Sequence, residues 1–300
     1  MLFFAPGMRL VPRLSLFFVG AMTIVLSVRT WIEIGRNSES FEADMKRDHR
    51  VLGRVVLPAT GYLEALTAAA SALMHCAATD VEVADVTLKE AMLLEDEGPG
   101  RILQAVIAPA VADGSRTASI CSVQDGTPDD EVWAEHATAR LRRATGSNPA
   151  AGITSLADAR ARCSRVLSVD EHYSVIAHRG VAFGESFKVV RQLWCGDVDA
   201  LAEVTLTPAL AKEAERYTVH PVLLDGCLQA MAALFAADDE NLYLPIGVAR
   251  WRVLRPLGAR GWSHVSMPAG SGQTRRADIQ VFTADGVLAI ELEGVQLKRV

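Results

Sequence analysis

The sequence has little that would bind a polyanion. Its formal net charge is −6, and only 6% of its residues are aromatic. Nucleic-acid sites need clustered lysine and arginine side chains, often interleaved with aromatic residues, and no such patch occurs along the chain. We therefore expect no nucleic-acid partner.

Cysteine is scarce and shows no metal-binding or redox spacing. The five cysteines are scattered and odd in number, and none forms a C-x-x-C pair. A complete disulfide framework needs an even number, and a zinc site needs closely spaced ligands. We expect no metal and a reducing, cytoplasmic location. The cysteines are Cys76, Cys121, Cys163, Cys195 and Cys227.

No hydrophobic run is long enough for a spanning helix. The longest, residues 14–26, falls short of the roughly 20 apolar residues that a bilayer requires. Arg9 and Arg13 precede it, as in a signal peptide, but no small-x-small cleavage site follows. A targeting or membrane segment, a buried strand or helix, and sequence foreign to the domain all stay open. We favour the last two over export, and expect no stable membrane insertion.

Several common catalytic motifs are absent. The sequence has no G-x-G-x-x-G, no H-E-x-x-H and no G-x-S-x-G, since the nearest match, residues 184–188, ends in lysine. These absences argue against dinucleotide binding, zinc-protease chemistry and a serine hydrolase elbow.

A short internal repeat is present instead. Residues 61–66 (Gly-Tyr-Leu-Glu-Ala-Leu) align with residues 226–231 (Gly-Cys-Leu-Gln-Ala-Met) at an offset of 226 − 61 = 165. Both lie in alanine-rich segments with large apolar residues at helical spacing, the first over residues 59–78. Two similar halves, each with a central helix, follow from the repeat.

Each helix is followed by stretches rich in Val, Ile and Thr that end in turn residues, which predicts strands. The expected architecture is α+β, with two antiparallel sheets that each wrap a long central helix. The expected divisions are an apolar N-terminal segment (1–40), a first half (41–145), a linker (146–167) and a second half (168–300). The strands are expected at residues 81–94, 102–111, 117–124, 131–142, 242–254, 261–267, 277–283 and 287–300.

His49 is the first candidate for chemistry. Histidine is the commonest general acid or base, although most histidines in a folded chain are structural. His49 lies on a loop just ahead of the first helix, where Gly53 permits unusual backbone angles and Pro58 fixes the helix start.

Asp225 is the second candidate, and its role has two interpretations. Through the repeat it aligns with Thr60, and both residue types favour helix N-caps, so the first interpretation is that Asp225 only caps its helix. Alternatively, Gln229, one turn further on, could hydrogen-bond and orient the carboxyl group as an acid. Burial would raise the carboxyl pKa and the helix N-terminus would lower it, and the sequence leaves that balance open.

Four motifs in order resemble the dehydratase domain of modular polyketide synthases. They are His49-x-x-x-Gly53-x-x-x-x-Pro58, residues 180–187, His220-Pro221-x-x-x-Asp225-x-x-x-Gln229 and Leu244-Pro245, and the similarity covers about residues 41–300. The resemblance implies a double hotdog fold with His49 as base, Asp225 as acid and Gln229 orienting the acid. It also implies substrate-binding or orienting roles for Gly53, Pro58, Phe183, Gly184, His220 and Pro221.

The reaction implied by the resemblance is dehydration of a β-hydroxyacyl thioester to the α,β-enoyl thioester, a hydro-lyase reaction of polyketide biosynthesis. The substrate would ride on the phosphopantetheine arm of an acyl carrier protein, with no other cofactor. Expected partners are that carrier, other synthase domains and a second copy of the domain. Thioester hydrolysis, enoyl isomerisation and a non-catalytic scaffold stay open as alternatives.

The sequence departs from the family pattern at three positions. Val181 and Phe183 occupy the tyrosine positions of the family's Gly-Tyr-x-Tyr-Gly-Pro motif, and Glu185 replaces its proline. Two phenol hydroxyls are therefore missing, and we expect the Glu185 charge near the tunnel mouth. Residues 1–40 also do not match the family's lead-in.

Overall fold

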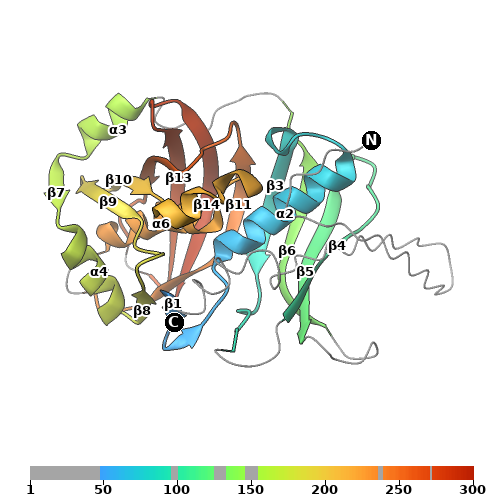
Figure 1. Ribbon diagram of the computed structural model, residues 1–300, viewed down its shortest axis with the longest axis horizontal. Coiled ribbons are helices and arrows are strands. Elements are labelled where there is room, and N and C mark those ends of the chain that lie inside the picture. The colour runs from blue at the N-terminus through green and yellow to red at the C-terminus, as the bar shows by residue number, and fades with distance from the viewer. Residues whose placement is uncertain (1–47, 96–100, 125–132, 146–154, 236–238, 271) are drawn as a thin grey trace.

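The computed structural model describes residues 48–95, 101–124, 133–145, 155–235, 239–270 and 272–300. Two helices, α2 (Ala59–Met74) and α6 (Pro221–Gln229), lie next to each other at the centre of the molecule and pack on one large sheet (Figure 1). Within the described ranges, no helix combines the length and the apolar character needed to cross a bilayer. Residues 1–40, residues 146–154 of the predicted linker and residues 131–132 of the strand predicted at 131–142 lie outside these ranges.

Each half of the chain supplies a helix and a set of antiparallel strands, so the predicted double hotdog is confirmed. The first half supplies β3 (Val81–Leu88), β4 (Arg101–Ile107), β5 (Arg116–Gln124) and β6 (Ala134–Arg143). The second supplies β7 (Arg165–Leu167), β9 (Val190–Cys195), β10 (Asp199–Thr205), β11 (Tyr243–Val253), β12 (Arg260–Ser266), β13 (Thr274–Thr283) and β14 (Leu288–Arg299).

The two sheets are joined rather than separate. Their strands run in the order β4-β5-β6-β3-β11-β14-β13-β12-β10-β9-β7, and β3 pairs with β11 through Val83–Trp251 and Val86–Val248. This pairing satisfies the backbone groups of two edges that would otherwise be exposed. The two helices therefore share one continuous eleven-stranded sheet, which the repeat alone did not predict.

Short helices cover the start of the second half. Ser155 caps α3 (Leu156–Arg162) and Ser168 caps α4 (Val169–His178), each accepting a backbone N–H three residues on. Residues 155–167, assigned to the linker from sequence, form α3 and β7, and β7 pairs with β9 of the second half. The remaining short elements are α5 (Pro208–Ala211), η1 (Ala78–Asp80), η2 (Ala214–Arg216) and η3 (Ala230–Leu234).

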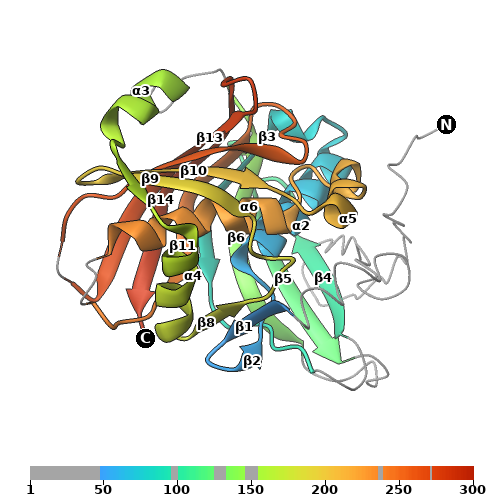
Figure 2. The same ribbon diagram turned by 60° about the vertical axis from the view of Figure 1, so that its left-hand side comes forward.

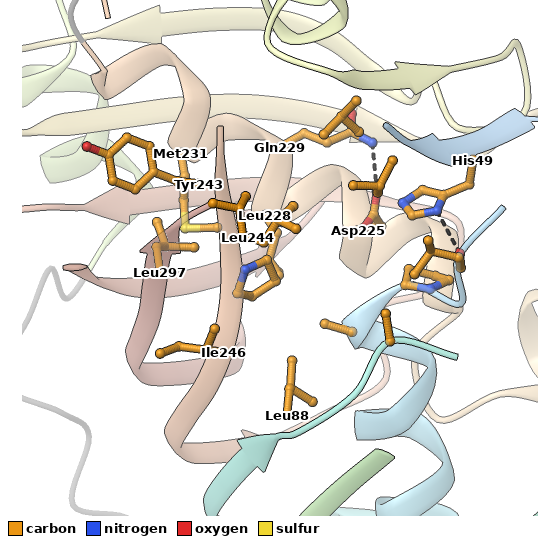
Figure 3. Close-up of a pocket in the computed structure, with 18 of the residues that line it drawn as sticks. His49, Leu88, Asp225, Leu228, Gln229, Met231, Tyr243, Leu244, Ile246 and Leu297 are labelled. Carbon is orange, nitrogen blue, oxygen red and sulfur yellow. Dashed lines mark hydrogen bonds between the residues drawn. The ribbon is translucent and has the colours of Figure 1, made fainter. Parts of the chain in front are cut away.

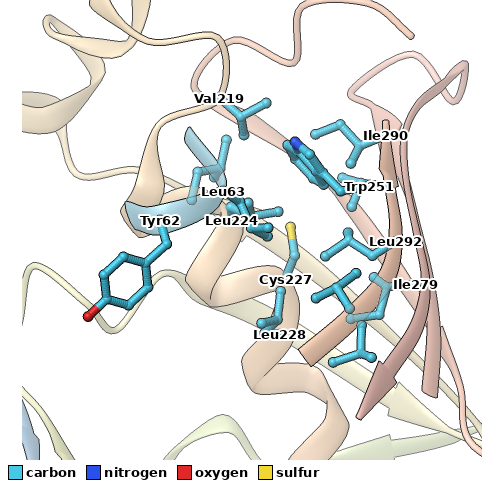
Figure 4. Packing of buried hydrophobic residues seen from close by; sticks show 14 of the residues in the cluster. Tyr62, Leu63, Val219, Leu224, Cys227, Leu228, Trp251, Ile279, Ile290 and Leu292 are labelled. Carbon is cyan, nitrogen blue, oxygen red and sulfur yellow. The ribbon is translucent and has the colours of Figure 1, made fainter. Parts of the chain in front are cut away.

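The core fills the space between the paired helices and the sheet (Figure 4). Trp251 of β11 is 1% exposed, and its indole N–H donates to the Thr67 hydroxyl of α2 at 2.8 Å. The Thr60 hydroxyl donates to the Pro221 carbonyl at 3.0 Å, which ties the two helices together at their starts. The helix that carries Asp225 is thereby held against the helix that follows His49.

The repeat places Glu64 of α2 at the position equivalent to Gln229 of α6. Glu64 is buried, and its two carboxyl oxygens accept the backbone N–H groups of Thr218 at 2.7 Å and Val219 at 3.2 Å. Burial raises the pKa of this carboxyl from 4.5 to about 7, although the two N–H groups favour the anion.

Glu64 should make the stability of the fold depend on pH. Because its folded pKa lies above its unfolded pKa, the stabilising contribution is complete below pH 4.5 and is lost as the pH rises through about 7. Relative to Glu64→Gln, the wild-type free energy of unfolding should fall by about 3 kcal/mol between roughly pH 4 and pH 8. Urea unfolding at stepped pH measures this difference.

The matched control is Glu215→Gln, because Glu215 is exposed and an exposed carboxyl stays hydrated in both states. Its difference from wild type should not change over the same pH range. A constant difference between wild type and Glu64→Gln would contradict the assignment of the titration to Glu64.

Candidate active site

His49 lies in a strand rather than in the predicted loop. It opens β1 (His49–Val51), which forms a small sheet with β2 (Arg54–Val55) and β8 (Val181–Phe183), next to α4 (Figure 2). His49 pairs with Phe183 across that sheet. Gly53 turns the β1–β2 hairpin at φ +77°, a conformation that favours glycine, and Pro58 directly precedes α2 as predicted.

The His49 imidazole is buried, and a backbone carbonyl group sets its neutral tautomer. Nδ1 lies 2.8 Å from the Val56 carbonyl oxygen, which can only accept, so Nδ1 carries the proton in the neutral ring. Nε2 then bears the lone pair, and it faces Asp225 across the pocket (Figure 3). The ring is packed against Phe183 at 5.6 Å and Phe187 at 5.0 Å between centroids. His49 is therefore oriented as a proton acceptor.

Asp48 anchors the strand that carries His49. Its carboxylate accepts the Ser186 backbone N–H at 3.0 Å and the Ser186 hydroxyl at 2.5 Å, and its carbonyl accepts the Gly184 N–H at 2.7 Å. A Cβ at Gly184 would lie 2.0 Å from Asp48 Oδ1, which explains the glycine. Gly184 therefore positions the backbone beside His49.

Asp225 is not a helix cap. Helix α6 begins at Pro221, and His220 is its N-cap, with Nδ1 accepting the Val222 N–H at 3.2 Å. Asp225 is the fifth residue of the helix, one turn past the free N–H groups. The capping interpretation, and with it the capping role implied for Thr60, was wrong because the alignment carried no information on where each helix starts.

Gln229 makes the hydrogen bond that its spacing predicts. Its Nε2 donates to Asp225 Oδ2 at 2.9 Å and also to the Phe187 carbonyl at 3.0 Å. Burial raises the pKa of Asp225, while the nearby His49 and the Gln229 hydrogen bond oppose that shift. Desolvation is the largest of these effects, so the carboxyl group is held toward its protonated form.

His49 and Asp225 line one pocket of about 430 Å³ (Figure 3). Most other lining residues are apolar, and Lys89 and Glu90, just after β3, add two charged groups. The lining comes from β1, α2, the end of β3, α4, β8, the α6–η3 segment, β11 and β14, which are far apart in the sequence. The lining includes Val51, Val56, Leu57, Pro58, Tyr62, Leu88, Ile176, Val181, Phe183, Leu228, Gln229, Met231, Phe235, Tyr243, Leu244, Pro245, Ile246 and Leu297.

Four residues to which the resemblance gave substrate-binding or orienting roles lie outside this lining: Gly53, Gly184, His220 and Pro221. They lie in the β1–β2 hairpin, the loop after β8 and the start of α6. Glu185 is also outside the lining; its side chain is 91% exposed and pairs with Lys188 at 3.1 Å. Its carboxylate therefore takes no part in the pocket wall, and its placement near the pocket mouth stays a prediction.

Sequence reasoning missed much of the apolar wall. Leu88, Met231, Ile246 and Leu297 occupy ordinary helix or strand positions, with no local signal beyond apolar character. In the described part of the chain, no group of three or more His, Cys, Asp or Glu residues could hold a metal ion, and the five cysteines are free thiols.

Comparison with known proteins identifies the family. The family model "Polyketide synthase dehydratase N-terminal domain" matches residues 151–300, and "Polyketide synthase dehydratase domain" matches residues 37–123. The chain belongs to the polyketide synthase dehydratase family.

Curated relatives are large synthases. The chain is 30% identical over 255 residues to the mycocerosic acid synthase-like polyketide synthase of Mycobacterium tuberculosis, covering 83% of this chain and 12% of the relative. It is 31% identical over 262 residues to the spectinabilin polyketide synthase system protein NorA' of Streptomyces orinoci, covering 84% and 7%. For polyketide synthase PksN of Bacillus subtilis, the identity is 26% and the shares are 83% and 4%. The chain therefore spans only a small part of these proteins.

Solved structures agree with the family. The dehydratase domain from the CurF module of curacin polyketide synthase superposes with a TM-score of 0.75 at 27% identity, covering 87% of this chain and 91% of that domain. An inactive aspartate-to-asparagine variant of the CurK dehydratase gives a TM-score of 0.76 at 28% identity, covering 88% and 91%. The similarity therefore extends over nearly the whole domain.

Proposed function

We propose that His49 and Asp225 together remove water from a β-hydroxyacyl thioester bound in the pocket. Dehydration in polyketide biosynthesis is the reaction of the family, which favours it over the hydrolysis, isomerisation and scaffold roles that the sequence left open. The assignment of each step to a residue rests on the geometry of this site.

In the proposed mechanism, His49 Nε2 takes the α-proton, which the thioester carbonyl acidifies. The electron pair of that C–H bond forms the α,β double bond as the bond from the β-carbon to oxygen breaks. Asp225 gives its proton to the departing hydroxyl, since hydroxide is a poor leaving group and water a good one. The site ends with an imidazolium and a carboxylate, and passage of one proton from His49 to Asp225 restores it.

One observation carries the proposal: His49 and Asp225 line one pocket, and the ring nitrogen of His49 that faces Asp225 is the one left free by the Val56 carbonyl. The Val56 carbonyl holds the proton of His49 on Nδ1, which leaves a base directed into the pocket. Burial raises the pKa of Asp225, which favours an acid at the facing position. A concerted elimination requires one group that accepts a proton and another that donates one, and the surroundings of the two side chains favour these two roles.

Variants of a relative support the same pair. The CurK dehydratase is described as inactive when one histidine is replaced by phenylalanine and when one aspartate is replaced by asparagine. Those structures share 28% and 27% identity with this chain. Dependence on one histidine and one aspartate agrees with the roles proposed for His49 and Asp225.

The apolar wall supports an acyl chain as the ligand. Beyond the catalytic pair most of the wall is apolar, as at Leu228, Met231 and Leu244, and the charged residues Lys89 and Glu90 line it just after β3. Val181 and Phe183 line the same wall without hydroxyl groups. The proposed substrate is therefore a β-hydroxyacyl group with an apolar remainder, delivered on the phosphopantetheine arm of an acyl carrier protein without any further cofactor.

The curated relatives are large polyketide synthases, which suggests that the partners of this domain are other synthase domains. We propose that the domain works in the cytoplasm beside other polyketide synthase domains, as a pair of identical copies. Size measurement in solution by light scattering tests the pairing; a mass of one chain at working concentration would contradict it.

A direct assay tests the reaction. The protein is incubated with a 3-hydroxyacyl chain loaded on a carrier protein, and the acyl-carrier mass is followed with time. Loss of one water is the expected result. Release of free acid would indicate hydrolysis, and an unchanged mass over long incubation with several chain lengths would contradict the proposed dehydration.

A further inference from the structure

We infer that Tyr173 of α4 is a positioning residue for the proposed acid, acting on Asp225 through Gln229. Tyr173 is absent from the pocket lining, so it has no direct contact with a bound chain. Its hydroxyl group nevertheless lies two hydrogen bonds from the Asp225 carboxyl. The inference rests on the proposed function, because it assigns a role toward the same acid.

Every polar atom of the Gln229 side chain has a defined partner. Nε2 donates to the Phe187 carbonyl at 3.0 Å and to Asp225 Oδ2 at 2.9 Å, and Oε1 lies 2.9 Å from the Tyr173 hydroxyl. A carbonyl oxygen can only accept, so the Phe187 carbonyl requires the NH₂ end of the amide. Gln229 Oε1 must then face Tyr173, and the phenol must donate to it.

The Tyr173 hydroxyl is itself fixed from the other side. It accepts the backbone N–H of Val190 at 3.0 Å, and burial raises its pKa, so it stays a protonated donor. Its ring packs edge-on against Phe183 with centroids 6.2 Å apart. The direction of donation therefore runs from Val190 N–H to Tyr173, then to Gln229, then to Asp225.

This direction determines which oxygen of Asp225 carries the acidic proton. Oδ2 accepts an N–H from Gln229 and so is occupied as an acceptor, which leaves Oδ1 to hold the proton. If the amide of Gln229 turned over, its oxygen would face the Phe187 carbonyl and the carboxyl group, and this orientation of the acid would be lost. Tyr173 opposes that turn because it offers a donor where the turned amide would need an acceptor.

Tyr173→Phe tests the inference. The ring and its packing remain, but Gln229 Oε1 loses its donor, so the amide is held only through Nε2 and its position beside Asp225 is less fixed. We expect kcat for dehydration to fall roughly tenfold to a hundredfold, as for a small misplacement of a catalytic group, with KM within about twofold. Because the Gln229 hydrogen bond lowers the pKa of Asp225, its loss should move the alkaline limb of the kcat profile to higher pH. A role in folding alone would not shift that limb.

A double-mutant cycle tests whether the effect passes through Gln229. Once Gln229→Ala has removed the amide, Tyr173→Phe should lower kcat by less than about twofold further. Losses that multiply in the double variant would overturn the inference, since Tyr173 would then act independently of Gln229.

Thr67→Val is the matched control, because the buried Thr67 hydroxyl also accepts an N–H, from Trp251 at 2.8 Å, and donates to a carbonyl, that of Leu63 at 2.7 Å, outside the pocket lining. It should leave the alkaline limb at the wild-type pH. An equal shift in both variants would overturn the inference in favour of general loosening.

A second variant covers the case in which Tyr173→Phe does not fold. Site-specific 3-fluorotyrosine at position 173 keeps the size of the ring and makes the hydroxyl a stronger donor. The stronger bond should move the alkaline limb to lower pH. An unmoved limb would contradict the action of Tyr173 on Asp225 through Gln229. Failure of the proposed function is separate, because wild-type protein would then leave the 3-hydroxyacyl carrier unchanged.

Discussion

His49→Ala should lower kcat for dehydration by roughly two to four orders of magnitude, the usual contribution of a general base. The imidazole is the group with a lone pair aimed into the pocket at Asp225, and its orientation depends on the bond from Nδ1 to the Val56 carbonyl. Alanine leaves a small cavity beside Phe183 and Phe187 but no proton acceptor. Steady-state formation of the enoyl product on a carrier protein measures the change.

The matched control for this change is His178→Ala, since His178 is exposed at the end of α4 and outside the pocket lining. It should retain wild-type kcat. Circular dichroism and thermal unfolding check that His49→Ala is folded. A folded His49→Ala variant with kcat near that of wild type would remove His49 from the role of base.

Asp225→Asn should lower kcat by a similar two to four orders of magnitude while the fold is retained. Asparagine keeps the shape of the side chain, and its amide oxygen can still accept the N–H of Gln229. It has no acidic proton, so the hydroxyl would have to leave as hydroxide. Because burial disfavours the carboxylate at this position, the variant should unfold at the same temperature as wild type or higher.

The pH dependence of the wild-type activity is a second test of Asp225 as the acid. Its activity should fall as the pH rises through the raised pKa of Asp225, because the group must be protonated to act. Asp85→Asn, at an exposed position of β3 with φ +51° that asparagine tolerates, is the control and should leave kcat and its pH profile unchanged. Substantial turnover by folded Asp225→Asn would exclude Asp225 as the acid.

The sequence predicted well the structural features that are set by residues close together in the chain. Stretches rich in Val, Ile and Thr located β3, β4, β5, β6, β11, β12, β13 and β14 with their ends correct to within about six residues, and the three- and four-residue spacing located both helices. The strands β1, β2, β7, β8, β9 and β10 were not predicted, because they are short or lie outside the stretches that follow the two helices. The hydrogen bond from Gln229 to Asp225 was predictable because residues four apart on a helix meet one turn later. The cap interpretation of Asp225 failed because the start of α6 is set by His220 and Pro221, which the repeat does not match.

Features that depend on contacts between distant segments were not predictable. The β1–β8 pairing that turns the expected loop around His49 into a strand joins residues more than a hundred positions apart. The same holds for the β3–β11 junction that merges the two sheets. Tyr173 gave no motif signal, because its value lies in the position of its hydroxyl relative to Gln229 and Val190.

By itself, the sequence determined the two helix-and-sheet halves through local periodicity and residue type, and its resemblance to a known family implied the roles of the base and acid candidates. Only the tertiary structure decided that His49 and Asp225 face one apolar pocket, which nitrogen of His49 is free, and that burial outweighs the effects favouring the Asp225 anion. The reason is physical: desolvation and hydrogen-bond direction depend on what surrounds a group in space, and the surroundings of this site come from both halves of the chain.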